Sequence, residues 1–183
     1  RTRPWLWEFM AWTAREWNQV QDAWWWNTAA PPTVHCSRKY GLMRPSMKAC
    51  VWLGAPDCYG DQGSVLWTES RGNVANRLAG RMDIERSESG HHFRHGRAGQ
   101  AAADRGGVTP FNVLPVATTG GYPPQRYGHG ASTPLSLCRW WVRYICPPGG
   151  LVLDPFAGSG TVGVAAVQEG RRFLGIEREP EYV

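Results

Sequence analysis

A doubly wound α/β fold is predicted from two features of this chain. The first is a strand, loop, helix and strand in residues 151–177, where an apolar run, a glycine-rich turn, a helical pattern and a second apolar run follow one another. Such a unit is typical of nucleotide-binding sheets. The second is a pair of upstream apolar runs, at 23–28 and 47–53, which indicate further strands. We expect a mixed core, with a basic, loop-rich insert where the apolar periodicity is lost.

The glycine-rich turn has the composition of a ligand-binding loop. Gly158 and Gly160 carry no side chains, so the backbone can turn sharply there and bring its N–H groups close to a ligand. The helix predicted over 161–169 begins at this turn, so its unpaired N–H groups and positive dipole end face the same place. Glu177 follows the second strand, where such units place an acid that binds ribose hydroxyls.

The two helices of this part of the chain have predicted ends. Gly170 suits a left-handed cap after the first, and Arg171 lies next to its negative end. The other helix, upstream of the glycine turn, is predicted to begin at Thr133 and Pro134 and to end before Pro147. The hydroxyl of Thr133 would cap it. Its expected apolar face consists of Leu135, Cys138, Trp141, Val142 and Ile145. That face should pack into the core.

Two nucleotide classes fit the turn. Residues 158–163 match the G-x-G-x-x-G pattern of dinucleotide binders, which keeps a nicotinamide-dependent oxidoreductase open as an alternative. A dinucleotide loop usually leaves the strand directly, whereas here Asp154-Pro155-Phe156 stands between the strand and the glycines. A carboxylate at a strand end suits a ligand with an ammonium group, and S-adenosylmethionine is such a ligand.

The run DPFAGSGTVGVAAVQEGRRFLGIEREPEY resembles the cofactor motif of the S-adenosylmethionine-dependent DNA amino-methyltransferases, which make N6-methyladenine or N4-methylcytosine. The preceding run PLSLCRWWVRYICPPGG resembles the helix and turn that lead into that motif in the permuted, beta-type order. The resemblance implies a Rossmann-like methyltransferase sheet. It also implies that the cofactor-binding residues are Asp154, Pro155, Phe156, Ala157, Gly158, Ser159, Gly160, Thr161, Glu177 and Thr133.

One motif departs from the family pattern. The family's upstream cofactor motif commonly reads His-Pro-Thr-x-Lys-Pro, and this chain has His129-Gly130-Ala131-Ser132-Thr133-Pro134. Only the first and last positions agree. We expect Thr133 and Pro134 to preserve the local geometry as the start of a helix.

Bulk composition favours a polyanionic partner, and double-stranded DNA is the partner that the resemblance implies. The chain has 183 residues, a formal net charge of +5 and a pI near 9.2. Its five cysteines include no C-x-x-C pair, so neither a disulfide framework nor a zinc site is indicated, and a reducing cytoplasm is the simple interpretation. No run is long and apolar enough for a membrane span.

The N-terminal part reads as a helix over 5–21 followed by strands at 23–28 and 47–53 and a short apolar run at 65–67. Tryptophan is abundant there, with Trp5, Trp7, Trp12 and Trp17 spaced as one helical face. Core filling is favoured over a base-stacking platform for these rings.

The stretch 69–107 is expected to be a long functional loop or a partly disordered one. In the resembled family, the region between the catalytic and cofactor blocks recognises the target. The arginines that could contact phosphates or guanine edges are Arg71, Arg77, Arg81, Arg94 and Arg97. A solvated linker is an equally weighted alternative. The histidines at 91, 92 and 95 have no ligand partners at metal-binding spacing.

No catalytic tetrapeptide is found. Enzymes of the resembled type use Asp, Asn or Ser, then Pro-Pro, then an aromatic residue, so that polar acceptors and a stacking ring act on a flipped-out base. The three Pro-Pro pairs here, at 31–32, 123–124 and 147–148, lack that combination. The weak candidate region is Ala30, Pro31 and Pro32. In the permuted order the motif would precede Arg1, and we expect this chain alone to be inactive.

These interpretations divide the chain into three parts. Residues 1–68 would belong to the methyltransferase core, 69–128 to a target-recognition insert, and 129–183 to the cofactor-binding part of the core. Two rivals remain open: the oxidoreductase, and a non-catalytic DNA-binding remnant with a vestigial pocket. The choice of adenine or cytosine, the recognition sequence and any restriction-modification partner, in a phage or a bacterium, also stay open.

Overall fold

The computed structural model describes residues 4–28, 46–68, 83–87, 90–94, 102, 104–117 and 133–182, and for 83–87 and 90–94 the backbone alone. The chain forms two compact units. One joins Arg1–Gly60 to Asn112–Val183, and the other is Asp61–Phe111. No helix in the described ranges is long and apolar enough to cross a membrane.

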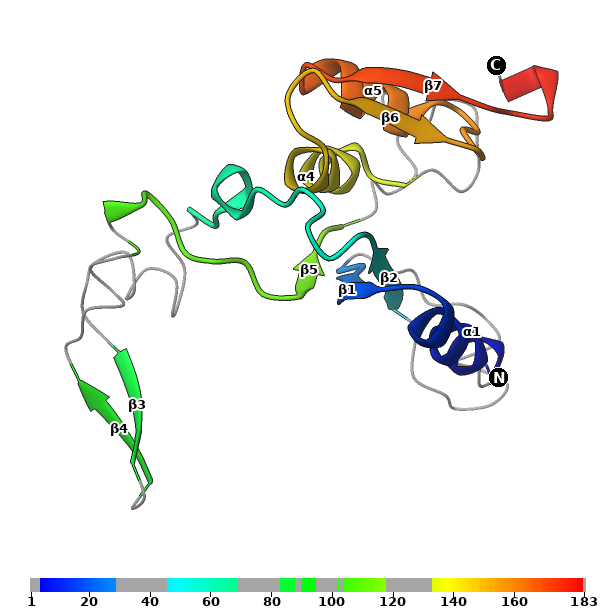
Figure 1. Ribbon diagram of the computed structural model, residues 1–183. Helices are drawn as coiled ribbons and strands as arrows, with labels where there is room; N and C mark the ends of the chain where they lie inside the picture. The colour runs from blue at the N-terminus through cyan, green and yellow to red at the C-terminus, as the bar shows by residue number, and fades with distance from the viewer. Residues whose placement is uncertain are drawn as a thin grey trace, which may run out of the picture. The chain divides into compact units, whose positions relative to one another are not determined.

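The first unit begins with helix α1 (Pro4–Glu16) and a small mixed sheet (Figure 1). Strand β1 (Gln19–Trp26) lies in the middle, antiparallel to β2 (Met47–Leu53) and parallel to the short β5 (Val113–Pro115). Trp25 anchors this sheet, because it is 3% exposed and its Nε1–H donates to the carbonyl of Val116 at 2.8 Å.

The predicted helix over 5–21 was too long. The backbone leaves the helix after Glu16, and Asn18 donates its side-chain amide to the carbonyl of Gly54 at 2.8 Å while the Gly54 N–H donates back to the Asn18 carbonyl. This pairing starts the β1–β2 ladder, in which Gln19 faces Leu53. Long-range strand pairing outweighs the helical pattern of these residues.

The interpretation of the N-terminal tryptophans as core residues is wrong for the rings on α1 and at its end. Trp5, Trp7, Trp12 and Trp17 are 45–64% exposed. By contrast, the run Trp24-Trp25-Trp26 on β1 has Trp25 in the core, whereas Trp26 is 46% exposed. Alternation along the strand separates these neighbours, since successive side chains point to opposite faces.

The C-terminal part of the same unit contains the predicted strand, loop, helix and strand. Helix α4 (Leu135–Ile145) leads into β6 (Leu151–Asp154), and α5 (Thr161–Gln168) connects β6 to β7 (Arg172–Gly175). The two strands are parallel, with Leu153 opposite Leu174. A 3-10 turn, Pro180–Tyr182, follows. This arrangement confirms the α/β class predicted from the sequence.

Helix α4 packs against two core clusters at once. Its Leu137 joins Trp25 and Leu114, and its Cys138 and Val142 pack with Ala165 of α5. The expected apolar face was therefore incomplete, because Leu137 is buried and Ile145 is 39% exposed. The expected start was also wrong, since Pro134 is the N-cap residue and no side chain caps the helix.

The second unit contains secondary structure that the sequence did not predict. A 3-10 turn (Gln62–Val65) is followed by a hairpin of β3 (Asp83–Ser87) and β4 (Gly90–Arg94), which pair antiparallel. An isolated bridge joins Trp67 to Val108. The hairpin corrects the expectation of a stretch without regular structure. Each strand holds a single large apolar residue, Ile84 or Phe93, which gives no apolar periodicity.

Candidate cofactor-binding site

The loop after β6 is held by a ladder that continues past both strands. Beyond the paired strands, the Ile176 N–H donates to the Asp154 carbonyl at 2.8 Å, and the Ala157 N–H donates to the Ile176 carbonyl at 2.9 Å. The Asp154 carboxylate accepts the N–H of Phe156 at 3.0 Å. The backbone is thus fixed by hydrogen bonds as it leaves the sheet.

Both glycines of the turn have positive φ values, which agrees with the sharp turn that the sequence predicted. Gly158 has φ +51° and Gly160 φ +74°, in the left-handed region that L side chains rarely adopt. A Cβ added at Gly160 would meet no atom within 4 Å. Backbone conformation explains glycine at 160, and the open space beside it is available to a ligand.

The N-terminus of α5 opens onto this turn. Gly160 is its N-cap residue and, having no side chain, leaves the first turn without a side-chain cap. Thr161, the first helical residue, is 7% exposed. The first N–H groups of a helix have no intrahelical partners, and together with the dipole they favour a negative or polar group. The site therefore has donors along one side.

Glu177 bridges the turn and the segment after β7. One of its carboxylate oxygens accepts the Gly158 N–H at 2.7 Å, and the other accepts the Glu179 N–H at 2.9 Å. The sequence predicted an acid here that would bind a ribose, and that role stays a prediction. The structure shows that the same carboxylate fixes the glycine turn. Both atoms are held by backbone donors, so the carboxylate has one defined position.

Close packing under the loop requires glycine at a third position. A Cβ at Gly163 would lie 2.6 Å from a ring carbon of Phe173, so α5 can approach β7 only because residue 163 has no side chain. A Cβ at Gly175 would lie 2.8 Å from the same ring. The ring of Phe173 thus sets the distance between α5 and β7.

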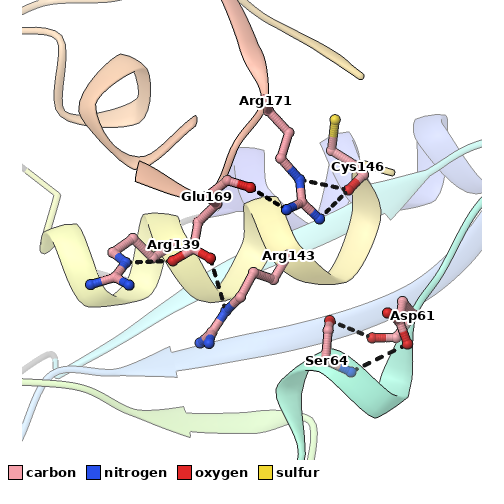
Figure 2. Close-up of polar contacts among 7 residues, drawn as sticks. All are labelled: Asp61, Ser64, Arg139, Arg143, Cys146, Glu169 and Arg171. Carbon is pink, nitrogen blue, oxygen red and sulfur yellow. Dashed lines mark hydrogen bonds and ion pairs between the residues drawn. The ribbon is translucent and has the colours of Figure 1, made fainter. Parts of the chain in front are cut away.

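Helices α4 and α5 are joined by ionic contacts (Figure 2). The carboxylate of Glu169 accepts Arg139 Nε at 2.5 Å and lies 3.8 Å from Arg143 Nε. Arg171 donates from Nε and Nη2 to the Cys146 carbonyl at 3.1 and 2.9 Å, and from Nη1 to the Glu169 carbonyl. The predicted placement of Arg171 at a helix end is confirmed, and Gly170 has φ +72°.

The thiol of Cys138 lies in the core between these helices. Burial is the larger cause of its high pKa, which is raised to about 11, and the negative charge of Asp154 adds to the shift. The thiol therefore stays protonated at neutral pH. It is an apolar core group and not a nucleophile.

The residues expected to bind the cofactor fall into two places. Those from Asp154 to Thr161 form one continuous turn with Glu177 beside it, and within this turn the ring of Phe156 is 87% exposed. Thr133 is exposed and lines a cavity with Leu151 and Val162. That cavity is the feature that sequence reasoning missed, because no motif encodes the space between elements.

The other expected site residues give less structural information. Arg94 ends β4, and its side chain is not described. Ala30, Pro31 and Pro32 and the arginines at 71, 77, 81 and 97 lie outside the described residues. Among the residues that are described, no group of three or more His, Cys, Asp or Glu side chains could hold a metal ion.

The family model described as DNA methylase, N6_N4_Mtase, matches residues 16–183. The chain belongs to this family. The match covers both the N-terminal sheet and the glycine turn, so the resemblance inferred from the last third of the chain is confirmed. It favours an amino-methyltransferase over the oxidoreductase alternative, and S-adenosylmethionine is the cofactor that the family and the fold support.

Similar proteins include two type II methyltransferases from bacteria. Type II methyltransferase M.Cfr9I of Citrobacter freundii is 53% identical over 55 residues, which are 30% of this chain and 18% of that protein. Type II methyltransferase M.XycI of Xanthomonas campestris pv. cyanopsidis is 36% identical over 97 residues, 53% of this chain and 31% of that one. The chain thus spans less than a third of these two relatives.

A solved structure supports the fold. The PvuII DNA methyltransferase (cytosine-N4-specific) superposes with a TM-score of 0.67 and 19% identity, over 97% of this chain and 54% of that one. At this identity the likeness concerns the fold. The predicted Rossmann-like methyltransferase class is therefore confirmed.

Proposed function

We propose that this chain supplies the S-adenosylmethionine-binding part of a DNA amino-methyltransferase, which methylates N6 of adenine or N4 of cytosine in double-stranded DNA. The observation that carries the proposal is the fixed turn from Asp154 to Thr161, with open space at Gly160 and the Glu177 carboxylate beside it. A bacterial or phage-infected cytoplasm is the corresponding location.

Each side of the turn suits a different part of the cofactor. The carboxylate of Asp154 suits an ammonium group, and the N–H groups at the start of α5 suit a carboxylate. Glu177 is an acceptor for ribose hydroxyls, and the exposed ring of Phe156 offers an apolar surface. When bound, the cofactor supplies an electrophilic methyl group on a sulfonium. The chain's own contribution is to align that group, because alignment lowers the barrier of an in-line transfer.

We infer that the chain binds this cofactor without turning it over. Acceptors for the amino hydrogens and a ring that stacks on the base are needed to make an exocyclic nitrogen nucleophilic. Each of the three Pro-Pro pairs in the sequence lacks a preceding Asp, Asn or Ser and a following aromatic residue. Methyl transfer to DNA by this chain alone would contradict the inference.

Residues 69–128 are proposed to contact DNA, with phosphate or guanine contacts from Arg71, Arg77, Arg81, Arg94 and Arg97. The basic net charge supports this role. The division into core parts at 1–68 and 129–183 around this insert is part of the same proposal. Binding to duplex DNA should weaken steeply as salt is raised, with a smaller slope when these arginines are replaced.

The deciding experiment is calorimetric titration with S-adenosylhomocysteine and, separately, with NAD. We expect heat with the first ligand alone. Glu177→Ala should weaken S-adenosylhomocysteine binding by about tenfold or more, because it removes the ribose acceptor and releases the Gly158 N–H. Glu181→Gln, at an exposed residue of the 3-10 turn that follows Glu177, is the control and should bind normally.

The rivals predict different results. Heat with NAD alone would support the oxidoreductase. Salt-sensitive DNA binding with no heat from either ligand would support a DNA-binding remnant. Equal binding by the Glu177→Ala and Glu181→Gln variants would remove Glu177 from the site.

A further inference from the structure

Helix α5 has few side chains that lock its position along its own axis. Its buried residues have small side chains or none: Thr161, Gly163, Ala165 and Ala166. Such residues form shallow ridges, and it is the interlocking of ridges that fixes one helix against another. Packed helices that interlock weakly can slide along each other. The Phe173 ring sets the distance between α5 and β7, which leaves the position of α5 along its axis to other contacts.

The position along this axis matters because α5 begins at the glycine turn. Gly160 is the N-cap residue, and its carbonyl accepts the Val164 N–H at 2.9 Å. The helix has eight residues, which corresponds to a length of about 12 Å. Groups that bind a ligand must be held within about 0.5 Å of their productive positions. A contact that fixes the C-terminal end of so short a helix therefore also fixes the N–H donors at its N-terminus.

Glu169 makes such a contact at the C-terminal end of α5 (Figure 2). It is the C-cap residue of the helix, and its side chain is 11% exposed. Its carboxylate accepts Arg139 Nε of α4 at 2.5 Å and lies 3.8 Å from Arg143 Nε. Residues 135–145 and 161–168 contain no Asp or Glu. The one acid at the end of either helix thus lies in the contact between them.

The placement of these charges is unfavourable within each helix taken alone. A carboxylate at the C-terminus of α5 lies at the negative end of the helix dipole. On α4, Arg139 and Arg143 are like charges four residues apart, which destabilises a helix. The contact between the helices offsets both effects, because the carboxylate lies against both guanidinium groups. Violations of local preference that are offset by distant contacts occur mainly at functional sites.

We propose that Glu169 is a positioning residue for the glycine turn. Held by Arg139, it fixes α5 along its axis and so places the first N–H groups of the helix against the ligand. Glu169 acts from the opposite end of α5 and does not contact the ligand itself. Arg171 supports the same arrangement, since it donates to the carbonyls of Cys146 and Glu169. The inference rests on the proposed function, because the ligand in question is S-adenosylmethionine.

The test is calorimetric titration of the full 183-residue chain with S-adenosylhomocysteine. Arg139→Gln and Glu169→Gln should each weaken binding by about threefold to tenfold. The double variant should bind no more weakly than the weaker single variant, because both substitutions remove the same contact. The reversed pair, Arg139→Glu with Glu169→Arg, keeps the attraction between the helices and should bind within about twofold of the parent.

Arg178→Gln is the matched control. The Arg178 guanidinium contacts Glu179 at 2.6 Å, so the substitution removes the same charge from an ion pair of similar length. This pair joins neighbours in sequence and the Arg178 side chain is 91% exposed, so binding should equal that of the parent. Thermal unfolding, followed by circular dichroism, shows that each variant is folded at the titration temperature. A contact that only stabilises the fold would lower the melting temperature without changing the affinity of the folded chain.

Three outcomes would overturn the inference and leave the proposed function intact. Unchanged affinity in Arg139→Gln and Glu169→Gln would reduce the contact to a structural one. Equal losses in Arg139→Gln and Arg178→Gln would show that net charge determines the affinity. A reversed pair that binds as weakly as the single variants would show that attraction between the helices is not what positions the turn. Absence of binding by the parent chain, by contrast, would refute the proposed function and this inference together.

Discussion

The segment from α4 to β7 and the segment from α1 to β2 are built in different ways. In the first, glycines and backbone hydrogen bonds define the structure: the Gly158 N–H meets Glu177, and Gly163 admits the ring of Phe173. In the second, aromatic side chains define it, with Trp25 in the core and most other rings exposed. The difference teaches that a loop defined by its backbone is complete within one segment, whereas a core of side chains needs partners from elsewhere in the fold.

The largest expected effect tests the aromatic segment. Trp25→Ala should destabilise the chain by about 3–5 kcal/mol, because it removes a buried indole and its hydrogen bond to Val116. Trp26→Ala, at a position 46% exposed, should cost less than about 1 kcal/mol. Denaturant unfolding of both variants measures the comparison. Similar losses would show that the two adjacent rings are equally important to the core.

The next effect tests close packing in the C-terminal segment. Gly163→Ala should destabilise by about 1–3 kcal/mol, because the new methyl group would lie 2.6 Å from the Phe173 ring. Adding Phe173→Leu should recover part of the loss. Thermal unfolding of the single and double variants provides the measurement, and a Gly163→Ala protein as stable as the parent would show that the helix can move away from the strand.

A third experiment separates backbone strain from ligand binding. Gly160 and Gly149 have φ values of +74° and +73°, and a Cβ at either would meet nothing within 4 Å. Alanine at each should cost about 1 kcal/mol of stability. Only Gly160→Ala should also weaken S-adenosylhomocysteine binding, by about tenfold, since its methyl group enters the ligand space. Equal affinities in calorimetry would move the ligand away from the glycine turn.

The smallest effect concerns Cys138, whose pKa is raised to about 11 from 9.0. Because the folded state favours the protonated thiol, its stabilising contribution is complete below pH 9.0 and is lost as the pH rises through about 11. Thermal unfolding between these pH values should show a smaller decline for Cys138→Ala than for the parent. Parallel declines would mean that this thiol does not control the alkaline limit of stability.

The sequence predicted best where the backbone itself is constrained. Gly158, Gly160 and Gly170 were each expected to support a turn or a left-handed cap, and all three have positive φ. Glycine requirements depend on local conformation, which a single sequence records directly. The place of Arg171 at a helix end followed from another local argument, the negative end of the helix dipole.

Prediction failed where distant contacts decide. Gln19 to Gln21 continue a helical pattern, yet pairing with β2 makes them a strand. The exposure of Trp5, Trp7 and Trp12 could not be foreseen, because their spacing cannot show whether another element covers them. The cavity lined by Thr133, Leu151 and Val162 could not be foreseen either. Helix α4 and two sheets that lie far apart in sequence form it.

A single guanidinium has a consequence for the motions of the C-terminal segment. Arg171 holds the last carbonyls of α4 and of α5 together, at Cys146 and Glu169. Neither helix can fray at that end without releasing the other, so their terminal amide protons should exchange with solvent in one shared opening. Loosening at the end of α4 is thereby transmitted to the helix that begins at the glycine turn.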